Sequence, residues 1–154
     1  MSARLSADLV SAEGERQSEL IDTFKMHKGG EYTEALVEAI HKLDGATREK
    51  VRDALAERLT RMTAATLRAR LKDADREMRS AAALACGMKE DKSLVPDLIN
   101  LLTDPDERVS QAARVALESL TEKKNLGPRA GATPEQRAEA ARRWRAWWLK
   151  QQGE

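Results

Sequence analysis

Residues 67–88, LRARLKDADREMRSAAALACGM, recur in altered form 31 positions later as residues 98–119, LINLLTDPDERVSQAARVALES. The offset aligns the aspartates of two turns and the alanines that follow them: Asp73 with Asp104, Asp75 with Asp106, and Ala81 with Ala112. A third, weaker copy, LVEAIHKLDGATREKVRDALAERL, precedes them at residues 36–59. Internal similarity at a fixed period of this length predicts an array of structural repeats.

Each copy is predicted to fold into two helices joined by a short turn. Leu98 and Leu102, spaced i and i+4, place two apolar side chains on one face of the first helix. Pro105 stops that helix, and the carboxylate of Asp106 is suited to cap the second by accepting a backbone N–H. A stripe of small residues should let the second helix pack closely on a neighbour: Ala81, Ala82 and Ala85 in the middle copy. Because neither helix can bury its apolar face alone, the pairs are expected to stack as a solenoid.

The segments that flank the repeats predict further helices. Residues 18–30, SELIDTFKMHKGG, read as one helix that Gly29 and Gly30 should end through a left-handed turn. Residues 1–13 are expected to be a frayed or disordered N-terminus, or a partial helix. Residues 122–132, rich in Gly, Pro and charge, are predicted to form a linker. Residues 133–151 then begin with Thr133, Pro134 and Gln136, which is the pattern of a capping box.

The segments DADREMRSAAALA and DPDERVSQAARVAL resemble HEAT repeats, specifically the short HEAT-like repeats named after phycobilisome lyases, with the pattern D-x-D-x-x-hydrophobic-R-x-x-A-A-x-A-L. The middle copy has Arg79 at the arginine position, the last copy has Ser110 there, and the first keeps Arg52 but lacks the D-x-D turn. The resemblance covers residues 31–121. It implies an all-α fold: an α-solenoid of about three HEAT-like helix pairs over residues 14–121, with an extra N-terminal helix and a C-terminal capping helix that carries the tryptophans.

The resemblance also implies pairing between the turn aspartates and the arginines of neighbouring second helices. The residues placed for such a ladder are Asp73, Asp75, Asp104 and Asp106 on the acidic side and Arg52, Arg79 and Arg108 on the basic side. Because Ser110 replaces the arginine in the last copy, the ladder is expected to weaken toward the C-terminus. On this reasoning Ser110→Arg should be neutral or stabilising.

All three tryptophans lie in residues 142–150, RRWRAWWLK. Trp144, Trp147 and Trp148 are spaced i, i+3 and i+4, so they share one helix face. In one interpretation the last helix folds back on the repeats and its indoles cover the exposed apolar end, which makes Trp144 and Trp148 a structural cap. In the other, the Trp and Arg side chains form a docking face for a protein or a nucleic acid.

Charge is distributed unevenly along a chain of net charge +1, with ten basic and six acidic residues at positions 48–79. That excess is small for a phosphate-binding surface, so nucleic acid is not the expected partner. The candidate binding-surface residues come from a hypothetical basic ridge in this region and from the docking face of the last helix: Arg52, Arg68, Arg76, Arg79, Arg145 and Trp147. Cys86, the only cysteine, aligns with Leu117 and is expected to be buried. A single thiol, no signal-like segment and no long apolar run favour a cytoplasmic protein with no membrane partner.

No catalytic or metal-binding pattern stands out in the sequence. There is no glycine-rich phosphate loop and no H-E-x-x-H motif, and His27 and His41 lack metal-ligand spacing. We therefore expect no cofactor and no enzymatic activity, but a module that binds or scaffolds proteins. Two alternatives remain open by resemblance: a subunit of a bilin-lyase-like enzyme, and a nucleic-acid-binding HEAT-like protein of the kind found among alkylpurine DNA glycosylases.

Overall fold

The computed structural model describes residues 1–122 and 124–153, and all regular structure in that part of the chain is helical. The chain divides into two compact units, Met1–Arg61 and Met62–Glu154. The first unit contains α1 (Ser2–Ser11), α2 (Gly14–Met26), α3 (Gly30–Lys42) and α4 (Gly45–Leu59). The second contains α5 (Ala64–Arg70), α6 (Arg76–Lys89), a 3₁₀ turn (Lys92–Leu94), α7 (Val95–Leu101), α8 (Glu107–Leu120) and α9 (Pro134–Gln152).

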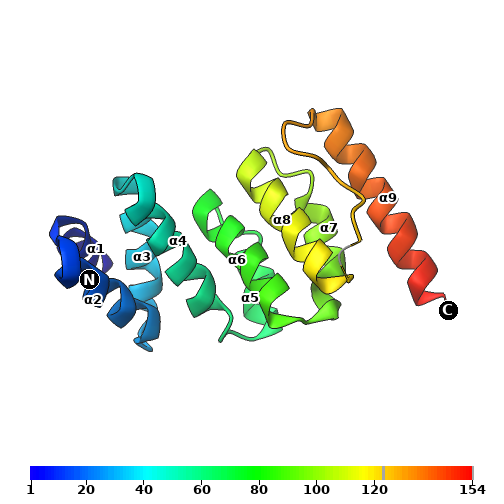
Figure 1. Ribbon diagram of the computed structural model, residues 1–154. Coiled ribbons are helices and arrows are strands. Elements are labelled where there is room, and N and C mark those ends of the chain that lie inside the picture. The colour runs from blue at the N-terminus through cyan, green and yellow to red at the C-terminus, as the bar shows by residue number, and fades with distance from the viewer. Residues whose placement is uncertain (123, 154) are drawn as a thin grey trace. The chain divides into compact units, whose positions relative to one another are not determined.

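In the first unit α1 lies along α3, and α2 lies along α4 (Figure 1). Of the alternatives for residues 1–13 the structure has a helix, not a frayed segment, so two helices precede α3. An isolated ten-residue helix is marginal in water, so α1 depends on packing. Leu9 is fully buried, and the Ser2 hydroxyl donates to Glu38 of α3 at 2.8 Å.

The connection between α2 and α3 differs from the sequence prediction. Gly29 and Gly30 do not end α2 in a left-handed turn, because α2 stops at Met26 and Gly29 is the N-cap of α3 with φ −70°. Arg58 of α4 satisfies the freed carbonyls instead: its guanidinium donates to Phe24 O at 2.9 Å, to Gly29 O at 2.7 Å and also to His27 O. Burial of this side chain lowers the pKa of Arg58 from its ordinary value.

The second unit repeats one helix pair and one turn. In Figure 1, α6 and α8 lie side by side in front of α5 and α7. Asp73 accepts the backbone N–H of Asp75 at 2.9 Å, and Asp104 accepts that of Asp106 at the same distance. Asp75 then caps α6, and Asp106 caps α8 by accepting from the backbone of Arg108 and Val109. The predicted N-cap role of Asp106 is confirmed, and the D-x-D motif is explained by two equivalent turns.

The small-residue stripe brings α6 and α8 into close contact, as predicted. Ala82 and Ala85 of α6 and Ala113 and Ala116 of α8 are buried. At Gly87 the approach is so close that an added Cβ would lie 2.9 Å from Ala116 Cα. Side chains larger than methyl at these positions would force the helices apart.

The last helix begins with the expected capping box, in which Thr133 and Gln136 bond each other's backbone N–H. Residues 124–132 of the predicted linker are anchored along α8, since Gln111 donates to Pro128 O at 3.3 Å and Glu107 accepts from the N–H of Gly131. Trp144 is fully buried, and its indole N–H donates to Gly127 O at 2.7 Å. Lys123 of the linker lies outside the described residues. In the described part of the chain, no helix combines the length and the hydropathy needed to cross a membrane.

Candidate interaction surface

Arg79 forms hydrogen bonds with other residues of the second unit. Its Nε donates to Asp104 Oδ2 at 2.9 Å and its Nη2 to Asp104 Oδ1 at 3.2 Å, which is a bidentate pair between consecutive repeats. Its Nη1 also donates to the carbonyls of Asp73 and Ala74. The Asp104 side chain is only 8% exposed and that of Arg79 only 17%. The implied ladder is therefore present at this position, and it uses most of the hydrogen-bonding capacity of Arg79.

The other candidate arginines also have partners in the fold, and their role as a binding surface stays a prediction. Arg52, in the first unit, pairs with Glu49 at 2.6 Å. Arg68 of α5 pairs with Asp97 at 2.9 Å, and Arg76 approaches Asp106 at 3.8 Å. Arg145 of α9 donates to the Asn100 side chain at 2.9 Å. Each therefore has an acidic or amide partner within its own unit.

The tryptophans fall into two environments. Trp144 is buried, whereas Trp147 and Trp148 are half-buried. The Trp147 ring lies edge-on to Trp144 with centroids 5.9 Å apart, and Lys124 Nζ lies 5.5 Å from the Trp147 centroid. The burial of Trp144 is compatible with the cap interpretation, and the assigned roles of Trp144, Trp147 and Trp148 stay predictions.

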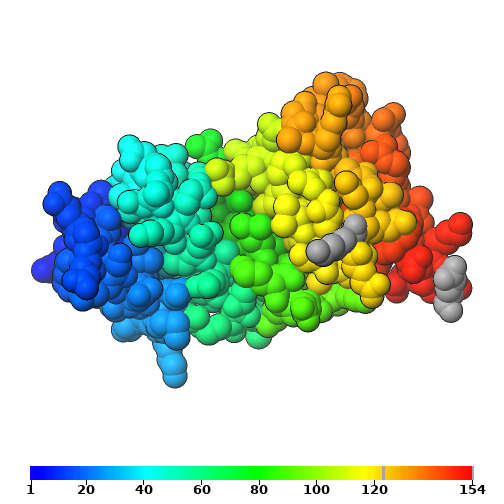
Figure 2. Space-filling model, in the orientation of Figure 1, coloured from blue at the N-terminus to red at the C-terminus, as the bar shows by residue number. Residues whose placement is uncertain are grey.

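Sequence reasoning missed a hollow on the face formed by α6 and α8. It has a volume of about 620 Å³ and is lined by Gly87, Met88, Glu90, Val115, Glu118, Ser119 and Glu122. Met88 and Val115 are large apolar side chains that are 51% and 42% exposed. Figure 2 shows the adjoining surfaces of α6 and α8 on the side turned to the viewer. The sequence offers one weak indication of this hollow, because both residues lie outside the alanine stripe of their helices. Neither residue is unusual by itself.

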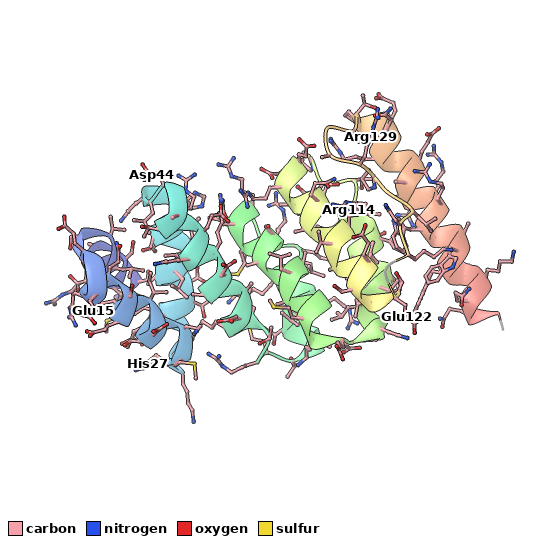
Figure 3. The ribbon with its side chains drawn as sticks, in the orientation of Figure 1. Glu15, His27, Asp44, Arg114, Glu122 and Arg129 are labelled. Atoms are coloured by element: carbon pink, nitrogen blue, oxygen red, sulfur yellow. The ribbon has the colours of Figure 1, made fainter. Side chains whose placement is uncertain are left out.

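The hollow carries one sign of charge. Three carboxylates line it, and among the described lining residues there is no lysine or arginine. Arg114 bonds one oxygen of Glu118 at 2.6 Å, and in Figure 3 Arg114 lies along α8 while Glu122 follows its C-terminal end. The last turn of α8 contains no basic residue. The C-terminal end of a helix dipole is itself negative, so the field of α8 adds to that of the carboxylates.

Two other hollows differ from this one in charge. The hollow between the linker and α9 is lined by Arg129 and Arg143 together with Glu139. The hollow against α1 and α2 in the first unit contains both Asp8 and Arg16. The hollow of α6 and α8 combines exposed apolar side chains with charge of a single sign, and it therefore has the most defined binding chemistry of the three.

Cys86 and His27 have structural surroundings. Cys86 is buried, and burial raises the pKa of its thiol to about 12, so the thiol stays neutral. His27 stacks on Tyr32 with centroids 3.9 Å apart, and its Nδ1 accepts the N–H of Gly29. Within the described residues no group of three or more His, Cys, Asp or Glu side chains is placed to hold a metal ion.

Comparison with known proteins matches the repeats to one family. The family model for HEAT repeats matches residues 33–118 and, in an overlapping second match, residues 64–133. Together the matches cover more than half of the chain, including the three helix pairs from α3 to α8. Comparison with curated proteins and with solved structures gave no match.

Proposed function

Because the chain belongs to the HEAT-repeat family, an all-α class of α-solenoid proteins, we propose that it is a non-catalytic protein-interaction module that binds its partner on the α6–α8 face. HEAT repeats are generally helical modules for protein interaction. The observation that carries the proposal is the hollow in which Met88 and Val115 are exposed together. Exposed apolar residues gathered in one place and bordered by polar ones mark interaction sites more often than single exposed ones do.

Two finer assignments belong to the same proposal. The equivalent D-x-D turns support placing the repeats in the short class named after phycobilisome lyases. The single buried thiol suits a reducing compartment such as the cytoplasm. Neither assignment changes the proposed binding surface.

Site-specific photocrosslinking in cells of the source organism tests the proposal. A photoreactive phenylalanine derivative would replace Met88 or Val115 and, as controls, the more exposed apolar residues Met26 and Leu149. We expect covalent adducts with a discrete protein from the first two positions and few from the controls. Adducts that are absent at Met88 and Val115, or equally frequent at all four positions, would contradict a binding surface on this face.

A further inference from the structure

The structure assigns a chemistry to this partner: we propose that the α6–α8 hollow takes a cationic segment of another protein, with an apolar side chain flanked by lysines or arginines. This inference rests on the proposed function and names the partner's chemistry. The hollow presents an apolar centre and an acidic border within one surface, so the segment that complements it needs both features.

The apolar centre is formed by side chains from two helices. Met88 projects from α6 and Val115 from α8, and both are accessible. Methionine is flexible and polarisable, which suits it to partner side chains of different shapes. Gly87 has no side chain, and Ala116 of α8 lies against it where a Cβ would be, so the floor of the hollow is formed by the two closely packed helices while Met88 and Val115 border its opening. A leucine-sized side chain of the partner can therefore lie between Met88 and Val115.

The acidic border is formed by Glu90, Glu118 and Glu122. Of the described cations near these carboxylates, Arg114 pairs with Glu118 at 2.6 Å and Lys124 lies over Trp147. Lys89 is half-buried in the last turn of α6, and Lys92 is exposed in the turn that follows it. The charge of Glu118 is therefore balanced in part, and Glu90 and Glu122 carry most of the acidic character of the border. Glu90 and Glu122 are exposed. Lysine or arginine on either side of the partner's apolar residue would meet these carboxylates, and such pairing steers association and selects partners.

The same charges disfavour other classes of ligand. Three carboxylates at the C-terminal ends of helices repel the phosphates of nucleic acids and of anionic membranes. A second copy of the chain is the remaining competitor, because α9 exposes Arg142, Arg145 and Lys150 beside Leu149. We favour a different protein because a contact between α9 and the α6–α8 face would be heterologous, and it would extend into open chains unless its rotation closed a ring.

Fluorescence anisotropy with the full-length chain tests the inference. The probe is the labelled peptide AKRLLRKA, compared with the acidic peptide AEELLEEA and the serine peptide AKRSSRKA. The binding-site variant replaces Glu90, Glu118 and Glu122 by Gln, and the matched control replaces the exposed Glu15, Glu19 and Glu135 by Gln, so that both change the net charge equally. We expect the site variant to weaken binding of the cationic peptide by about tenfold and the control by less than about twofold. The serine and acidic peptides should bind weakly, and added salt should weaken binding of the cationic peptide.

Equal losses in the two variants, or equal binding of the acidic and cationic peptides, would overturn the inference. Thermal melting of both variants verifies that they are folded. Sedimentation of the chain alone tests whether a second copy occupies the hollow. If the chain self-associates and the site variant does not, the hollow is an interface between copies and the inference is overturned. If Met88 captures a partner in cells but the cationic peptide does not bind, the inference fails and the proposed function stands. Peptide binding lost in the site variant without any adduct at Met88 would support the cationic site and contradict the cellular role.

Discussion

The two ends of the α6–α8 pair use charged residues in opposite ways. At the N-terminal end, Asp75 and Asp106 cap the helices, and Arg79 forms its bidentate pair with Asp104. At the C-terminal end, Glu90 and Glu122 are exposed beside Met88. Charges at the first end are paired within the fold, whereas at the second end Arg114 pairs with Glu118 and the exposed Glu90 and Glu122 border an apolar hollow. One end therefore holds the repeats together, and the other is available to a partner.

Replacing serine by arginine at each end of α8 is expected to show the largest difference between the two ends. Ser110, at the N-terminal end of α8, is fully buried and donates to Leu102 O at 2.7 Å. The structure therefore reverses the expectation that Ser110→Arg is harmless, because arginine here would overfill the site and bury an unpaired charge. We expect a loss of about 3 kcal/mol or more in the free energy of unfolding.

Ser119→Arg is the matched control for this substitution, because Ser119 is exposed on the same helix and lines the hollow. It should change stability by less than about 0.5 kcal/mol and enhance repulsion of the cationic peptide. Chemical denaturation of both variants measures the difference. Similar stabilities for the two would show that the ends of α8 are not distinct.

Removing the carboxylate of Asp104 should have the next largest effect. Asp104→Ala leaves the partly buried guanidinium of Arg79 without its bidentate partner and the N–H of Asp106 without its acceptor. We expect a loss of about 2–3 kcal/mol in the free energy of unfolding. The control Asp97→Ala breaks the more exposed pair with Arg68 and should leave stability nearly unchanged. A loss at Asp104 no larger than at Asp97 would mean that the ladder is not a structural element.

Gly87→Ala probes the close approach of the two helices beneath the hollow. The added methyl would meet Ala116, and we expect a cost of about 1–3 kcal/mol. Gly30→Ala is the matched control, because a methyl added there would have no neighbour within 4 Å and the φ of Gly30 is not positive. Alkylation of the adjacent Cys86 by iodoacetamide, slow for a buried neutral thiol, should accelerate in Gly87→Ala alone. An unchanged rate and stability would show that the helices can separate freely.

Glu90→Gly should have the smallest effect, and in the opposite direction. Glu90 follows α6 with φ 59°, a left-handed conformation that glycine adopts without strain. We expect stability to rise by about 1 kcal/mol while affinity for the cationic peptide falls. Glu90→Asn, which tolerates this conformation, separates the loss of charge from the change in backbone preference. If the Glu90→Gly variant binds the peptide as tightly as the original chain, Glu90 does not contribute to the binding site.

The parts of the fold that sequence analysis predicted are those encoded by paired side chains in repeated positions. Asp104 was identifiable because the D-x-D motif occurs twice, and Arg79 because it matches Arg52 of the first copy. The role of Arg58 could not be predicted, because its acceptors in the α2–α3 connection are backbone carbonyls. Every residue has such a carbonyl, so the sequence does not show which ones Arg58 contacts. Helix α1 was uncertain because its stability comes from packing on α3 rather than from its own ten residues.

The hollow could not be predicted for a related reason. Met88 and Val115 are ordinary residues in their own helices, and they form a site only because α6 and α8 lie side by side. The prediction of an arginine surface depends on the concentration of basic residues at positions 48–79. Sequence alone did not show how many of those guanidinium groups would find partners within the fold, as Arg79 does with Asp104.

Backbone NMR of the isotope-labelled full-length chain, titrated with AKRLLRKA, tests the central distinction between the two ends most directly. We expect shift changes at the amides of Gly87, Met88, Glu90, Val115 and Ser119, with little change over residues 73–79 and 104–110. Shift changes concentrated at the D-x-D turns, or spread over both ends without preference, would contradict that distinction.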